Sequence, residues 1–109
     1  MIVNDDTVSK ALQYLAIDPH PVALARKDLT DAENEKERVF AEIYATQDGS
    51  IKDRETACER HAGVRDARKA MGAALFEVDR HRARVRAAEM LISVWQSENA
   101  NMRASERVR

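Results

Sequence analysis

Arginines near the C-terminal end of the chain are the side chains best suited to bind phosphate groups. Four of them fall within seven residues, and three more follow later. Guanidinium groups bind phosphate oxygens through contacts that are sensitive to salt and indifferent to base sequence. The sequence therefore predicts a phosphate-binding surface made of Arg80, Arg82, Arg84, Arg86, Arg103, Arg107 and Arg109.

The first four arginines divide into two pairs if this segment is helical. At 100° per residue, Arg80 and Arg84 share one flank of the helix. Arg82 and Arg86 share the other flank, where Arg68 joins them from further back in the chain. Either flank is a candidate for facing outward and binding phosphates.

The charge distribution offers these arginines a structural role as an alternative. The net charge is −1, but residues 1–62 carry −5 and residues 63–109 carry +4. Six acidic residues lie between positions 28 and 42. Arginines beside a coiled-coil seam often pair with acids on the facing helix, so the sequence leaves both roles open.

No set of side chains forms a recognisable catalytic or metal site. The histidines are His20, His61 and His81, and none lies three or four residues from another. Zinc sites need closely spaced histidine or cysteine ligands, and the chain has one cysteine, Cys58. We therefore expect a protein that is not an enzyme and that binds no metal or cofactor.

Composition indicates a helical chain. Glycine occurs three times and proline twice in 109 residues, while 34% of the residues are charged. These counts exclude a disulfide scaffold, a collagen-like chain and a glycine-rich phosphate loop. Apolar periodicity predicts helices over residues 7–16, 21–46 and 51–60, with a turn at 47–50 and a kink at 61–63.

Several residues are suited to the ends of these helices. We expect Asp5 or Asp6 to cap the first helix, because a carboxylate accepts hydrogen bonds from free amides of the first turn. Gly49 suits a left-handed conformation before the third helix. Ser50 and Asp53 have the spacing of a capping box, with Asp in place of the usual Glu.

The strongest pattern is a seam of twelve residues at alternating spacings of three and four, from Val64 to Met102. It predicts a helix of about 40 residues, which would be about 60 Å long. The helix over 21–46 would be about 39 Å long, so it cannot cover the whole seam. We therefore expect a second chain to cover the remainder, with an oligomer interface at Met71, Val78, His81, Val85, Ile92 and Trp95.

Two seam residues have alternative functional roles. His81 could meet its own copy in a symmetric dimer, where it would set the register or respond to pH, or it could simply be a tolerated polar residue. Trp95 is the only tryptophan, and it fits a core or interface position. It also fits an anchor for a partner peptide or an unpaired base.

These elements predict an all-α fold: an elongated antiparallel helical hairpin or coiled coil, oligomeric, with a short N-terminal helix and a short connecting helix. The predicted segments are residues 1–18 for the first helix and turn, 19–103 for the hairpin, and 104–109 for a basic tail. The chain begins without a basic leader and has no apolar run of about 20 residues. We expect no secretory signal, no membrane segment and a cytoplasmic location.

Two segments resemble parts of small helical phage proteins that are encoded among recombination genes. One runs from Gly49 to Glu55 and the other from Val94 to Arg103. The order of a long, a short and a long helix is also similar to that family, and the similarity spans about residues 21–103.

The resemblance implies a recombination mediator. Such a protein would form a dimer, bind single-stranded or duplex DNA, and help an annealing or strand-exchange protein onto strands coated by single-strand-binding protein. The seven arginines named above would then contact DNA in the cytoplasm of the host cell. An alternative is a structural coiled-coil adaptor or assembly chaperone, in which the same arginines only pair with acids. A third and less favoured alternative is a small inhibitor or regulator of a host enzyme.

Overall fold

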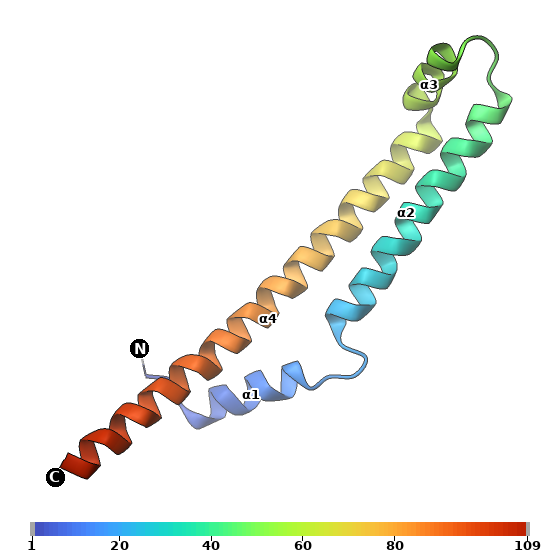
Figure 1. The fold of residues 1–109 in the computed structure, drawn as a ribbon. Coiled ribbons are helices and arrows are strands. Elements are labelled where there is room, and N and C mark those ends of the chain that lie inside the picture. Colours follow the sequence, from blue (N-terminus) through green and yellow to red (C-terminus); the bar gives the residue numbers. More distant parts are fainter. Residues whose placement is uncertain (1, 109) are drawn as a thin grey trace. The chain divides into compact units, whose positions relative to one another are not determined.

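A computed structural model of the chain describes residues 2–108, and these form four helices (Figure 1). No strand occurs within this range. The all-helical prediction is confirmed, including the order of a short, a long, a short and a long helix. The helices are α1 (Asp5–Leu15), α2 (Pro21–Thr46), α3 (Ile51–Arg60) and α4 (Ala62–Val108).

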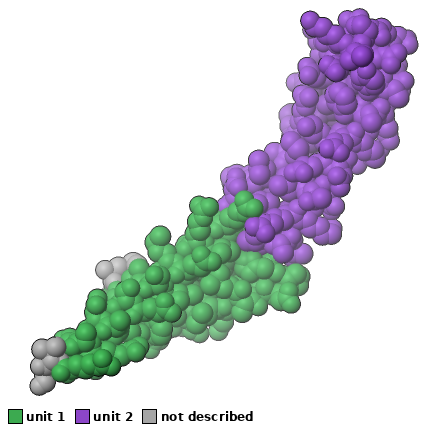
Figure 2. Space-filling view, in the orientation of Figure 1, with its two compact units in different colours: residues 1–21, 80–109 green, residues 22–79 purple. Residues whose placement is uncertain are grey.

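The helices pack as two compact units (Figure 2). Unit 1 combines residues 1–21 with residues 80–109, and unit 2 contains residues 22–79. Helix α4 therefore contributes its first part to unit 2 and its second part to unit 1. Each unit has its own buried side chains.

This division differs from the predicted segments. Residues 1–18 were predicted as a segment of their own, and helix α1 packs with the second part of α4 in unit 1. The predicted tail at 104–109 is helical as far as Val108, because α4 continues to that residue. Arg109 lies outside the described residues.

Helix α1 begins with a side-chain cap from Asn4. Its Oδ1 atom accepts a hydrogen bond from the amide of Thr7 at 2.7 Å. The prediction that Asp5 or Asp6 would be the cap is wrong by one or two positions. Both aspartates lie in the first turn instead, where their charge interacts favourably with the helix dipole.

The predicted turn before α3 is confirmed. Gly49 has a φ of +107°, a backbone conformation that side-chain-bearing residues rarely adopt. Ser50 Oγ accepts from the amide of Asp53 at 3.1 Å, and the Asp53 carboxylate accepts from the amide of Ser50 at 3.4 Å. This reciprocal capping box fixes where α3 begins.

The predicted break between α3 and α4 is also confirmed, and it occurs at His61. This residue has an extended backbone with φ −71° and ψ 134°. Its Nδ1 accepts from the amide of Gly63 at 3.0 Å, and its carbonyl accepts from the amide of Arg65 at 3.1 Å. One residue thus ends α3 and caps α4.

The interior of unit 2 lies between α2, α3 and the first part of α4. Figure 1 shows α2 and this part of α4 side by side and antiparallel. Val64 and Cys58 are fully buried, and the Cys58 thiol lies 3.9 Å from the carbonyl of Phe40. The buried apolar side chains of this unit are Ala25, Cys58, Val64, Ala67 and Val78.

The interior of unit 1 lies between α1 and the second part of α4. Ala11, Tyr14 and Ala88 form its buried cluster, with Leu15, Val85 and Ile92 packed against it. At the far end of α1, the amide of Val3 donates to Glu98 Oε2 at 2.9 Å. The two helices therefore run antiparallel, since low numbers of α1 meet high numbers of α4.

The packing of α1 on α4 changes the reason for expecting an oligomer interface, which was that part of the α4 seam would lie uncovered. We expected the seam beyond the reach of α2 to need a second chain, but α1 covers its residues Val85, Ala88 and Ile92, while Met102 at its end is 61% exposed. Val78 lies in the core of unit 2, and Val85 and Ile92 pack in unit 1. The other three predicted interface residues, Met71, His81 and Trp95, are half-buried within the chain.

A matched pair of substitutions tests this burial. Ala88→Leu should lower the free energy of unfolding by about 1–3 kcal/mol, because Ala88 is 6% exposed in the buried cluster with Ala11 and Tyr14, and a leucine would crowd those two side chains. Ala83→Leu, on the exposed side of the same helix, should change it by less than about 0.5 kcal/mol. Urea unfolding measures both, and equal effects would contradict the packing of α1 on α4.

Candidate nucleic-acid interface

The outer flank of α4 in unit 1 carries two arginines that the rest of the chain leaves available. Arg82 and Arg86 are exposed, and neither forms an ion pair with any described residue. They lie four residues apart, a rise of about 6 Å along one helix face. Like charges at this spacing destabilise a helix slightly, so an anion bound between them would relieve a repulsion.

The other flank is turned toward residues of the same unit. The Cζ atom of Arg84 lies 4.2 Å from the ring centroid of Tyr14 on α1. Arg80 Nη2 lies 3.4 Å from Nε2 of His81. Both arginines remain exposed, but their side chains contact neighbours within unit 1.

The acids of α2 are partly neutralised by bases of α2 itself. Arg38 pairs with Glu35 and with Glu42, one turn away on either side. The hydrogen bond from Arg38 holds the pKa of Glu35 below its usual value. Lys27 pairs with Asp31 at 3.1 Å.

Within unit 1, Arg82, Arg84 and Arg86 form no ion pair with any described residue, and their pairing with acids of α2 stays the alternative that the sequence left open. Every ion pair described above joins residues three or four apart on one helix. The outer flank therefore keeps its positive charge exposed to solvent.

The remaining predicted arginines lie at the C-terminal end of α4. Arg103 and Arg107 are exposed, and within the described residues neither has an ion-pair partner. Arg107 lies in the last turn of α4, where its positive charge interacts favourably with the C-terminal end of the helix dipole. The predicted contact at Arg109 falls outside the described residues.

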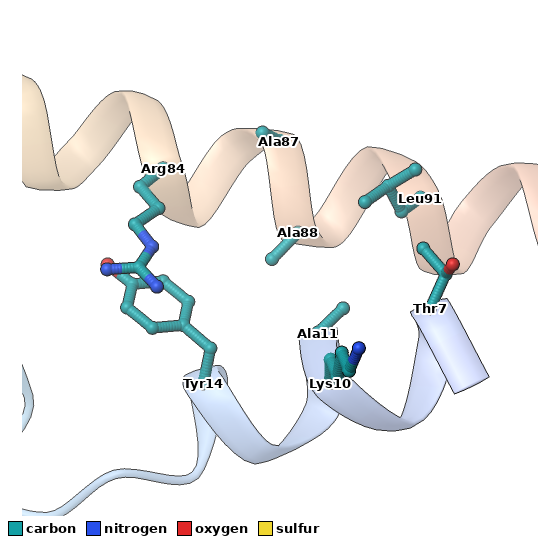
Figure 3. A pocket seen from close by; sticks show the side chains of 8 residues that line it. All are labelled: Thr7, Lys10, Ala11, Tyr14, Arg84, Ala87, Ala88 and Leu91. Carbon is teal, nitrogen blue, oxygen red and sulfur yellow. The ribbon is translucent and has the colours of Figure 1, made fainter.

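A shallow groove lies between α1 and α4 within unit 1 (Figure 3). It has a volume of about 270 Å³. Figure 3 shows Tyr14 rising from α1 and Arg84 reaching down from α4 to meet it at one end. The residues that line this α1–α4 groove are Thr7, Lys10, Ala11, Tyr14, Arg84, Ala87, Ala88 and Leu91.

Tyr14 is the least expected residue of this groove. Its side chain is only 7% exposed, and the hydroxyl group is buried without a hydrogen-bond partner among the described residues. A buried polar atom without a partner costs about 1–3 kcal/mol. The ring also contacts His20, with ring centroids 4.9 Å apart in an edge arrangement.

Trp95 serves the packing of α1 on α4. Its indole Nε1 donates a hydrogen bond to Asp5 Oδ1 at 2.9 Å. The side chain is half-buried in unit 1. This arrangement agrees with the core position that the sequence favoured for Trp95.

Arg68, which was expected to extend the outer flank, lies in unit 2 beside α2. There it lines a second shallow hollow together with Lys36, Glu37 and Phe40. Lys36 of α2 is half-buried there. Arg68 therefore belongs to unit 2, whereas Arg82 and Arg86 belong to unit 1.

Other kinds of site receive no support within residues 2–108. No group of three His, Cys, Asp or Glu side chains is arranged to hold a metal ion there. None of the helices in that range combines the length and apolar character that crossing a bilayer requires. The exposed arginines and the α1–α4 groove are the features of unit 1 that suggest a binding site.

Comparisons with protein-family models, with curated proteins and with solved structures found no match to this chain.

Among the groove residues, the sequence predicted a binding role for Arg84 and missed Tyr14. Apolar spacing in the sequence places Val8, Ala11, Leu12 and Leu15 on one face of the first helix, but Leu12 is 52% exposed, whereas Tyr14 is buried. The spacing of Val8, Ala11 and Tyr14 by three was the available signal.

Neutralising the outer flank tests whether it has a structural role. Arg82→Gln with Arg86→Gln should leave the urea midpoint unchanged or slightly higher, because the change removes a repulsion and no ion pair. Arg38→Gln is the control that does break ion pairs, and its midpoint should fall slightly. A clear loss of stability in the double variant would show that these arginines hold the fold together.

Proposed function

We propose that this protein is a DNA-binding accessory factor of phage-type recombination. In this proposal it is a binding protein rather than an enzyme, and it acts in the host-cell cytoplasm. It helps an annealing or strand-exchange protein onto strands that single-strand-binding protein covers. It binds DNA through the outer flank of α4 and works as a homodimer or higher oligomer.

The observation that carries this proposal is the exposed, unpaired state of Arg82 and Arg86. Two exposed guanidinium groups on one helix face, which form no ion pair with a described residue of unit 1, attract a polyanion at low salt. Unit 1 supports this interpretation, because its eight basic and six acidic residues give it a net charge of +2. Unit 2 carries −3.

The recombination role itself is supported by the resemblance of the segments at 49–55 and 94–103 to phage proteins. Phosphate contacts alone would fit any factor that binds DNA without reading its sequence. DNA binding and the recombination role are therefore separate parts of the proposal.

Charge reversal on the outer flank tests the DNA-binding part. Arg82→Glu with Arg86→Glu should weaken binding to a labelled oligonucleotide at least about tenfold at low salt. The slope of log affinity against log salt should become shallower by about two, one for each lost phosphate contact. Fluorescence anisotropy over a salt series measures both quantities.

The matched control reverses Arg65 and Lys69, which are exposed bases on the unit 2 part of α4. This control should leave the affinity and the slope near those of the wild-type protein. An equal loss in both double variants would mean that overall charge, rather than the outer flank, determines binding. No salt-sensitive binding by the wild-type protein would refute the proposal.

A structural adaptor or assembly chaperone is the second candidate, and exposed apolar side chains on α4 favour it. Phe76 is 64% exposed and its neighbour Leu75 is 48% exposed, both in unit 2. Large apolar side chains that remain accessible on a single chain are suited to contact another protein. The same residues would serve the proposed homodimer.

Self-association through this surface has its own test. Phe76→Ser should shift sedimentation equilibrium toward the 12.3 kDa monomer, because it removes the largest exposed apolar side chain of unit 2. Met90→Ser, at a 67% exposed position of α4 in unit 1, is the control and should not change the mass. A wild-type protein that is monomeric at micromolar concentration would contradict the oligomer.

A further inference from the structure

The α1–α4 groove has features that packing alone does not require. Arg84 lies over the ring of Tyr14 and is still exposed, so it has a side open to a ligand. Below it, the Tyr14 hydroxyl is buried without a partner among the described residues. A polar atom that enters beside Arg84 could bond this hydroxyl.

The charge of the lining favours an anionic ligand. Lys10 and Arg84 line the α1–α4 groove, and no acidic residue does. Lys10 pairs with Asp6 at 3.2 Å, but both side chains are 75% exposed. Exposed ion pairs of this kind are weak, so a phosphate can replace the Asp6 carboxylate.

The floor of the groove is small and apolar. Ala11, Ala87 and Ala88 let the two helices approach without filling the space between Lys10 and Arg84. The volume of about 270 Å³ is near the lower limit for ligand pockets, so it suits one flat group rather than a large molecule. A planar base with an attached phosphate combines these properties.

We propose that the α1–α4 groove binds one nucleotide of a single DNA strand, with the base on Arg84 and a phosphate at Lys10. This inference rests on the proposed function and names the form of DNA that the protein prefers. Guanidinium groups bind unstacked bases by stacking and cation–π attraction. A base inside a duplex is stacked on both sides, so only an unpaired strand can place one in the groove.

The groove and the outer flank then have different tasks. Arg82 and Arg86 bind phosphates of either single-stranded or duplex DNA. Arg84 and Lys10 add affinity only for the single strand. Substitution of Arg84 should therefore change the preference for single-stranded over duplex DNA. Substitution of Arg82 and Arg86 should change the affinity for both forms of DNA.

Lysine substitutions separate these tasks because lysine keeps the charge and loses the planar group. Arg84→Lys should weaken binding to a single-stranded oligonucleotide at least about fivefold and leave affinity for the duplex of the same sequence unchanged. Arg65→Lys, at an exposed position of the same helix outside both proposed binding surfaces, is the matched control and should change neither affinity. Fluorescence anisotropy at fixed salt measures all four values.

Two further measurements do not depend on the folding of the Arg84 variant. Lys10→Gln changes an exposed side chain and should make the salt slope for single-stranded DNA shallower by about one. A 2-aminopurine in the single-stranded oligonucleotide should gain fluorescence on binding to the wild-type protein, because a base in the groove no longer stacks on its neighbouring bases, which quench it.

Two results would overturn the inference in different ways. Equal binding of both DNA forms, unchanged by Arg84→Lys and Lys10→Gln but lost on reversal of Arg82 and Arg86, would refute the groove site and leave the proposed function intact. No binding of either form by the wild-type protein would refute both. Retained single-strand preference in the Arg84→Lys variant would also refute the groove site.

Discussion

The apolar seam of α4 is the constraint on which the rest of the structure depends. A helix of 47 residues is about 70 Å long, and its buried stripe needs partners along most of that length. The chain supplies them in two pieces: α2 beside the first part of the seam and α1 beside the second. Small residues such as Ala67 and Ala88 recur along the stripe and allow close approach.

Covering the seam determines where the charges of α4 lie. Once Val85, Ala88 and Ile92 face α1, the arginines between and beside them must lie on the flanks. Arg84 contacts Tyr14 on one flank, whereas Arg82 and Arg86 lie on the other and remain exposed. Packing and the proposed binding surface therefore have a common origin in the helical periodicity.

Sequence periodicity predicted the helices well, because apolar spacing, Gly49 and the Ser50 cap act locally. The bounds of α2 and α3 agree with the predicted ranges 21–46 and 51–60. The contact of α1 with α4 was missed because it joins residues about 70 to 95 positions apart, and Tyr14 and Arg84 gave no local sign of meeting. The arginines were identifiable from charge, but their ion-pair partners depend on tertiary packing.

The central claim is that one chain covers its own seam, with α1 packed on the second part of α4. Isotope-filtered NMR on a mixture of labelled and unlabelled protein tests it most directly, because it separates contacts within a chain from contacts between chains. We predict cross-peaks between the Tyr14 ring and the Ala88 methyl group within one chain. Cross-peaks that appear only between chains would mean that a second copy covers the seam, and this account of the fold would be wrong.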